Sequence, residues 1–376
     1  MISRRRRSAA LSAVIGLVLT LVPEPVRTTG AVSWTLPASR ADLALSTTSP
    51  VGMSVRESPV RHLDSPVDTV AVTAPGQGTA VDVRGLRSDG TWSEWVGARP
   101  GAAAVLPEAT TSVQTRLALT AGARPRAIDV TAWRAPGRRM GAMTPAQGTT
   151  FRIFATREGL VGGTTANGHV ITERDHFVAL PSRRGLASRG SGNYTVKVCT
   201  TDGARCEWAP VWDVGPWNTR DDHWNAERDM WPGLPHGKPQ AQAAYQDGHN
   251  GGRDQFGRVV RNPAGIDLAD GTFWDGLRLP TNAWVDVTYQ WTGHGPWGTV
   301  ETGGWQLNVR TGPSLDADRV GYAARHAQVR IDCAATGDRV RGTQGATARW
   351  YRLAPGMYVS AAYVRPGLAA APCRQP

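Results

Sequence analysis

Short stretches of alternating apolar and polar residues recur along most of the chain. Such alternation sends successive side chains to opposite faces and is typical of strands with one buried face. Long runs with helical spacing are missing, and only residues 222–229 and 268–277 suit short helices. The sequence therefore predicts an all-β protein. The clearest strand patterns are at residues 79–87, 127–133, 169–180, 206–215, 283–291 and 305–313.

The chain is long enough for several such units, since 376 residues correspond to two or three domains. Turn-rich segments without alternation separate the strand patterns, and 43 Gly with 26 Pro supply the turns. The predicted order is a signal peptide at 1–30, a linker at 31–66, a β-sandwich at 67–133, a second linker at 134–150, a central β domain at 151–292 and a small C-terminal barrel at 300–366.

The first residues resemble an export signal. Four arginines, Arg4 to Arg7, precede an apolar run from Ala9 to Val22. That run is too short to span a bilayer, and no later apolar segment approaches the necessary length. We therefore expect a secreted mature protein that is not held in a membrane.

The charge of the chain does not indicate a nucleic-acid partner. The formal net charge is +11, of which the predicted leader contributes +4, and only Lys197 and Lys238 among the 42 basic residues are lysines. The basic residues are scattered and form no patch or stripe, so we expect no nucleic-acid binding. A modest positive charge suits an anionic cell wall.

Four cysteines support export, because an even number in a secreted chain suggests disulfides. Cys199 and Cys206 flank an Asp-Gly hairpin turn, which favours a bridge between them. Cys333 and Cys373 are then expected to tie the C-terminal tail to the last domain. Zinc is a poor alternative, since no standard ligand spacing occurs.

Residues 305–364 resemble the bacterial SH3 domain. The likeness rests on LNVRTGPS at its start, from Leu307 to Ser314, and on WYRLAPGMYVSAAYV at its end. It implies docking to cell-wall peptide or glycan, with Asn308 and Trp350 as candidate binding residues. The alternative is that aromatics such as Trp350 simply fill the core of a very small barrel.

The central domain is dense in tryptophan and aspartate. Five tryptophans fall between Trp208 and Trp231, interleaved with carboxylates. Tryptophan faces stack on sugar rings, and carboxylic acids carry out acid chemistry on glycosidic bonds. A tryptophan-rich core with aspartates at turns explains the same composition, and the residues alone do not decide between the two.

The order of motifs in residues 151–291 resembles the double-psi β-barrel of the rare-lipoprotein-A and expansin type. VWDVGPWN contains the first aspartate of that pattern, Asp213, and GIDLADG contains the second, Asp267. VDVTY, from Val285 to Tyr289, matches the closing strand. The resemblance implies binding or cleavage of peptidoglycan or another polysaccharide.

The same resemblance assigns roles to individual residues. Asp267 is the candidate acid, for which a helix N-cap is the alternative. Asp213 is expected to orient substrate or Asp267, for which a turn aspartate is the alternative. Candidate glycan contacts are Trp212, Trp217, Trp224 and Thr172.

One departure from that pattern is large, because Asp213 and Asp267 lie 54 positions apart. The inserted piece, Trp217 to Pro263, is a lid or sugar platform in one interpretation and a plug of the groove in another. Its histidines and aspartates show no standard metal spacing, so no metal and no cofactor are expected.

Residues 79–133 resemble the sandwich that precedes amidase domains in secreted actinobacterial proteins, which implies an accessory module. The prediction is thus a secreted, cell-wall-associated protein whose partner is peptidoglycan or a cell-wall polysaccharide. Three hypotheses follow: a lytic transglycosylase with Asp267 as its acid, a non-catalytic glycan-binding or wall-loosening protein, and a structural envelope protein whose barrel binds a protein partner.

Overall fold

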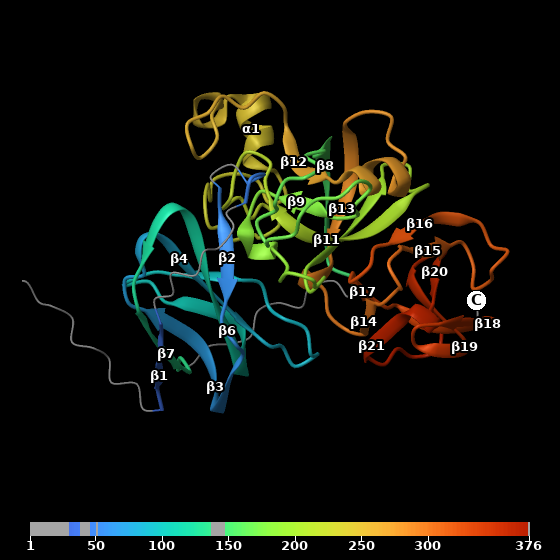
Figure 1. The fold of residues 1–376 in the computed structure, drawn as a ribbon, viewed down its shortest axis with the longest axis horizontal. Helices are drawn as coiled ribbons and strands as arrows, with labels where there is room; N and C mark the ends of the chain where they lie inside the picture. Colours follow the sequence, from blue (N-terminus) through green and yellow to red (C-terminus); the bar gives the residue numbers. More distant parts are fainter. Residues whose placement is uncertain (1–29, 38–45, 50–51, 137–146, 375–376) are drawn as a thin grey trace, which may run out of the picture.

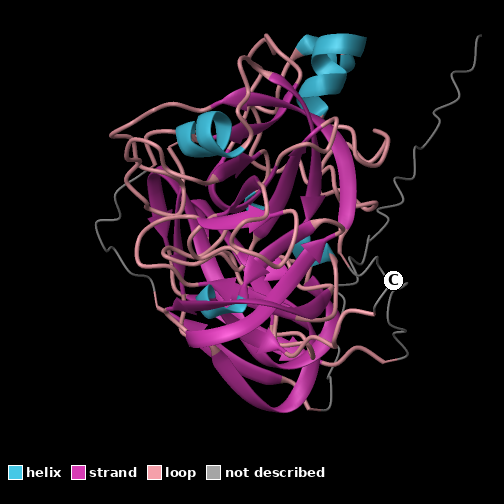
Figure 2. Ribbon diagram, turned by 90° about the vertical axis from the view of Figure 1, so that its right-hand side faces the viewer, coloured by secondary structure: helices cyan, strands magenta, loops and turns pink. Residues whose placement is uncertain are grey.

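The prediction of an all-β protein is confirmed. A computed structural model describes residues 30–37, 46–49, 52–136 and 147–374. Strands contain 49% of the residues and helices 9%, and strands make up most of the ribbon (Figure 2). The predicted signal peptide at 1–30 lies almost wholly outside the described residues, as does most of the second linker.

Seven antiparallel strands form one N-terminal sheet, in the order β1-β7-β3-β6-β4-β5, with β2 also paired to β6 (Figure 1). The strands are β1 (Val32–Leu36), β2 (Ser54–Glu57), β3 (Arg61–Val72), β4 (Gly76–Gly85), β5 (Val96–Ala98), β6 (Ala104–Pro125) and β7 (Ile128–Trp133).

The segment predicted as a linker, 31–66, is not one, because it supplies β1, β2 and the first half of β3. Its alternation is broken by an irregularity in β3, where the pairing with β6 shifts register between His62 and Val67. A register shift moves side chains to the other face, so the pattern of period two disappears from the sequence.

Six strands close into the central barrel, in the order β10-β13-β8-β12-β9-β11, and β11 pairs back with β10. Two of the pairs, β8 with β12 and β9 with β11, are parallel. The strands are β8 (Thr149–Arg157), β9 (Val178–Leu180), β10 (Thr195–Thr200), β11 (Cys206–Val214), β12 (Ala264–Leu268) and β13 (Ala283–Tyr289).

Alternation along these strands decides which residues face away from the barrel core. Ile153 and Ala155 of β8 and Ile266 and Leu268 of β12 are fully buried in that core. Residues between them point to the outer face, because successive side chains of a strand lie on opposite sides. Asp267 therefore stands on the outer wall of the barrel.

The C-terminal region is attached to the barrel through a parallel pairing of β11 with β16. An antiparallel run β16-β15-β20-β19-β18 follows, and a second sheet has the order β17-β14-β21. The strands are β14 (Trp297–Val300), β15 (Leu307–Arg310), β16 (Arg319–Ala323), β17 (Gln328–Arg330), β18 (Cys333–Gly342), β19 (Gly345–Ala354), β20 (Met357–Ser360) and β21 (Val364–Leu368).

The described helical segments are short. The predicted helix at 222–229 is absent, while the one at 268–277 corresponds to a six-residue π-helix. No helix in the described part of the chain is long and apolar enough to cross a bilayer. The segments are η1 (Arg183–Gly185), α1 (Gln240–Asp247), η2 (His249–Gly252), η3 (Gly271–Gly276), η4 (Gln290–Thr292) and η5 (Ala361–Tyr363).

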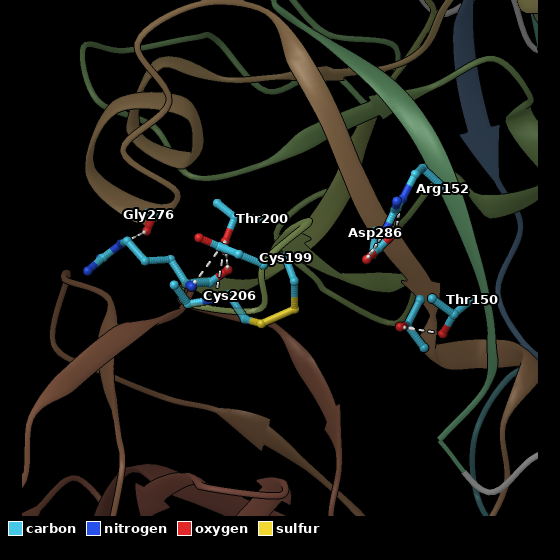
Figure 3. The surroundings of a disulfide bond; sticks show 11 residues. Thr150, Arg152, Cys199, Thr200, Cys206, Gly276 and Asp286 are labelled. Carbon is cyan, nitrogen blue, oxygen red and sulfur yellow. Dashed lines mark hydrogen bonds and ion pairs between the residues drawn. A yellow bond between two sulfur atoms is a disulfide. The ribbon is translucent and has the colours of Figure 1, made fainter.

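Both predicted disulfides are present. Cys199–Cys206 joins β10 to β11 across the hairpin, as Figure 3 shows, and Cys333–Cys373 joins the start of β18 to the tail. Disulfides persist in oxidising compartments, so this pairing suggests an extracellular or secreted protein.

A buried ion-pair network joins the N-terminal sheet to the barrel. Asp82 of β4 binds Arg116 of β6 at 3.0 Å and Arg183 of η1 at 3.0 Å. The ring of Trp95 is completely buried in the barrel core, and the Arg116 guanidinium lies 4.2 Å from its centre. These contacts make the sheet and the barrel one packed unit.

Candidate active site

Three carboxyl groups line one cavity of about 250 Å³ on the outer wall of the barrel. Glu158 directly follows β8, Asp213 belongs to β11 and Asp267 to β12. Thr48, Trp217 and Arg258, from outside the barrel strands, also line it.

Strand β9 explains how two aspartates that are distant in sequence meet. Its Ala179 is paired with Asp213 on one side and with Asp267 on the other. Neighbouring strands lie about 4.8 Å apart, so the two aspartate backbones are roughly 10 Å apart across β9. Ala179 also lines the cavity, and its small side chain leaves room between the two carboxyls.

Asp267 lines the cavity from β12. It lies inside β12, not at a helix start, so the N-cap alternative is wrong; the residue before η3 is Asp270. Burial among protein atoms raises the pKa of Asp267 to about 7, a hydrogen bond from Thr156 opposes the rise, and the charge of Asp213 adds to it. The residue is partly exposed and lines the cavity. Asp267 can therefore hold a proton near neutral pH and reach a ligand.

Asp213 is almost fully buried, at 2% exposed, and is heavily hydrogen-bonded. Its Oδ1 accepts hydrogen bonds from the backbone N–H groups of Ala166, at 2.7 Å, and Val214, at 2.8 Å. Its Oδ2 accepts one from the hydroxyl of Thr48. Burial raises the pKa of Asp213 although these bonds favour its charged form.

Glu158 forms an acid pair with Asp213. Both carboxyl oxygens of Glu158 are buried and receive no hydrogen bond from a donor in the described residues. Burial raises the pKa of Glu158 well above its usual range, and the charges of Asp213 and Asp267 raise it further. Burial and the two neighbouring carboxylates therefore favour the protonated, neutral form of Glu158.

These shifts predict how pH affects the Asp267→Asn variant. A raised pKa means that folded Asp267 binds a proton more tightly than the unfolded chain does, so its contribution to stability is lost as pH rises from about 4 to 7. Asparagine does not titrate. The variant should therefore become more stable relative to wild type as pH rises, by about 1–2 kcal/mol in the free energy of unfolding measured in urea. This value is smaller than the full pKa shift would give, because water reaches the cavity. A constant difference across the range would contradict the shift.

Of the predicted glycan contacts, only Trp217 lines the cavity. Its indole N–H donates to Asn262 Oδ1 at 2.9 Å, and the Arg258 guanidinium lies 5.8 Å from the ring centre. Arg258 is held by Asp254 at 2.5 Å. The insertion from Trp217 to Pro263 thus contributes one aromatic wall and one cation and leaves the cavity between the carboxyls open.

The other two tryptophans of this set lie elsewhere. Trp212 stacks on Phe177 with ring centres 5.7 Å apart. Trp224 is 2% exposed and stacks on Tyr289 at 4.9 Å. Trp224 therefore has no free face for a sugar, and the prediction that it binds glycan is corrected to a core position.

The remaining predicted contacts are also separate from the cavity. Thr172 is exposed and donates to Asp175 at 2.8 Å. Asn308 lies in β15 of the C-terminal sheet. Trp350 is 1% exposed, and its indole N–H donates to the backbone oxygen of Asp338 at 2.9 Å. Trp350 therefore fills a core, which was the alternative to its binding glycan.

Sequence reasoning missed Glu158, Thr48 and Arg258. Glu158 follows β8 in step with the outward-facing residues of that strand. This alternation is the only feature of the sequence that pointed to Glu158. Among the described residues, no group of three or more His, Cys, Asp and Glu side chains has a geometry that could hold a metal ion.

Comparison with known protein families finds a match for the barrel. A family model described as a domain of unknown function (DUF8814) matches residues 149–288, which span the barrel from the start of β8 almost to the end of β13. No curated protein and no solved structure matches the chain.

Proposed function

We propose that the protein is secreted and binds peptidoglycan or another cell-wall polysaccharide in the carboxyl-lined cavity, with Asp267 as the acid of a glycan-cleaving reaction. The observation that carries this proposal is the meeting of Asp267, Asp213 and Glu158 in one cavity with Trp217 in its wall. An acid with a pKa near 7 beside an aromatic surface is suited to protonating a glycosidic oxygen at neutral pH.

The proposed reaction needs only one acid and one internal nucleophile. The Asp267 proton passes to the glycosidic oxygen, and the bond between that oxygen and the sugar C1 breaks. In the lytic transglycosylase form, the muramyl 6-hydroxyl oxygen then bonds to C1 and its proton returns to the Asp267 carboxylate. The product carries a 1,6-anhydro ring, and no water is consumed.

We also propose a specific fold or role for each of the three parts of the chain. Six strands with parallel β8–β12 and β9–β11 pairs support a double-psi arrangement for the barrel. The antiparallel run of short C-terminal strands supports an SH3-like unit, although Trp350 is not one of its exposed residues. The N-terminal sheet is proposed as an accessory wall module.

The test is digestion of purified sacculi, with products read by mass spectrometry. The anhydro muropeptides we expect support the transglycosylase form, and new reducing ends would indicate hydrolysis. Pelleting with sacculi without products would leave a binding or wall-loosening protein. A protein that neither cleaves nor pellets would overturn the proposal and favour the structural envelope protein.

A matched variant, Ala179→Leu, fills the space between the carboxyls without removing any of them. It should abolish cleavage and weaken pelleting while the protein stays folded. Undiminished cleavage by this variant would show that glycan does not enter the cavity.

A further inference from the structure

Residues Ser46–Ser49, here called the strap, lie at the cavity although they precede the barrel by about a hundred residues. The strap is attached to the loop after β8 by two hydrogen bonds, from Thr47 N to Thr164 O at 2.9 Å and from Thr164 N to Thr47 Oγ1 at 2.8 Å. The Thr48 hydroxyl lies near Thr164 O, at 3.1 Å, and bonds to Asp213 Oδ2.

Thr48 supplies the hydrogen bond described at Oδ2 of Asp213. Two backbone N–H groups, of Ala166 and Val214, occupy Oδ1, and the Thr48 hydroxyl bonds to Oδ2. The backbone donors belong to the loop after β8 and to β11, whereas Thr48 lines the cavity from a separate segment of chain. A ligand hydroxyl therefore gains Asp213 Oδ2 by taking the place of Thr48.

Thr48 presents to Asp213 the same chemical group that a saccharide would present, an alkyl hydroxyl. We propose that Asp213 Oδ2 is a subsite for a glycan hydroxyl and that the strap occupies it as an internal substitute which glycan must displace. The substrate class in this proposal rests on the proposed function; the displacement of the strap does not.

The size of the cavity agrees with partial occupation. Ligand pockets usually enclose about 300–1,000 Å³, and the cavity of about 250 Å³ lies below that range while Thr48 forms part of its wall. Removing the strap would take Thr48 out of the cavity wall and leave Asp213 Oδ2 without its described donor.

The composition of the strap suits a segment that is released. Ser46, Thr47, Thr48 and Ser49 include no large apolar side chain, so its release exposes little hydrophobic surface. Its described bonds to the barrel are hydrogen bonds, each of modest net value because water can replace the partners.

The first experiment replaces the Thr48 hydroxyl with a methyl group of similar size, Thr48→Val. The probe is a soluble uncrosslinked peptidoglycan strand, and binding is measured by calorimetry. We expect about three- to tenfold tighter binding, because the competing internal hydrogen bond is lost. If wild type binds the strand, equal or weaker binding by Thr48→Val would overturn the proposal, since it would make Thr48 a support of the site.

The second experiment fixes the strap in place with a disulfide, Thr47→Cys together with Thr164→Cys, with oxidation verified by mass. We expect the oxidised protein to lose at least tenfold in strand binding, while the single variant Thr47→Cys retains it. Unchanged binding by the oxidised protein would overturn the proposal.

Hydrogen exchange distinguishes a failure of the strap proposal from a failure of the polysaccharide assignment. The amide of Thr47 should exchange faster in Thr48→Val than in wild type, whatever the natural ligand is. Unchanged exchange would overturn the strap alone. Absence of strand binding by wild type and Thr48→Val, with faster exchange in the variant, would overturn the polysaccharide assignment alone.

Discussion

Replacing Asp267 with asparagine lowers the rate of glycan cleavage by about 10²–10⁴-fold, the usual contribution of a positioned general acid. Asparagine keeps the shape of the side chain and accepts a hydrogen bond from Thr156, but it has no proton to give to the glycosidic oxygen. The rate is measured from the release of soluble muropeptides, and retained pelleting on sacculi would show that binding survives.

The control is Asp270→Asn, three residues away. Asp270 is paired with Arg157 at 2.7 Å, and its pair lies outside the carboxyl cavity. We expect its rate to stay within about twofold of wild type, because exposed ion pairs contribute little. Equal losses in both variants would indicate a general effect of removing negative charge, and an unchanged rate in Asp267→Asn would remove Asp267 from the reaction.

The largest effect on stability is expected from Asp82→Ala. Burial would by itself raise the pKa of Asp82, but Arg183 and Arg116 outweigh burial and hold it below its usual value. Alanine leaves these two buried guanidinium groups without their shared partner. Removing one member of a buried ion pair costs about 3–5 kcal/mol, so the free energy of unfolding, measured in urea, should fall by this amount.

Asp286→Ala serves as the comparison for that variant. Asp286 is paired with Arg152 at 3.0 Å, but the Arg152 side chain is 59% exposed. Its removal should cost no more than about 1 kcal/mol. If Asp82→Ala were as mild as Asp286→Ala, the buried network could not be what joins the N-terminal sheet to the barrel.

The parts of the fold that were predictable are those where one local signal suffices. Regular alternation identified β11 and β13 of the barrel, and the Asp-Gly turn between Cys199 and Cys206 indicated the disulfide. The linker prediction at 31–66 failed because β3 changes register within a strand. A break in alternation looks the same in a sequence whether the strand ends or continues with a shift.

The candidate site was only partly predictable because it depends on contacts between distant segments. Asp213 and Asp267 belong to motifs, whereas Thr48 reaches Asp213 across 165 positions of sequence. Trp224 was a candidate for stacking on sugar because it lies in a segment rich in tryptophan and aspartate. It is buried in the barrel core, where the Glu94 carboxylate, from the loop before β5, accepts its indole N–H. No spacing in the sequence indicates that partner.

The proposed reaction requires an acid in the cavity that keeps its proton near neutral pH. A carbon-13 NMR titration of the aspartate carboxyls of the full protein measures this property, with the Asp267 signal assigned by its disappearance in Asp267→Asn. We expect a midpoint of about 7 for this signal. A midpoint near the ordinary aspartate value of 3.8 would contradict it, because Asp267 would then be ionised at neutral pH and have no proton to donate.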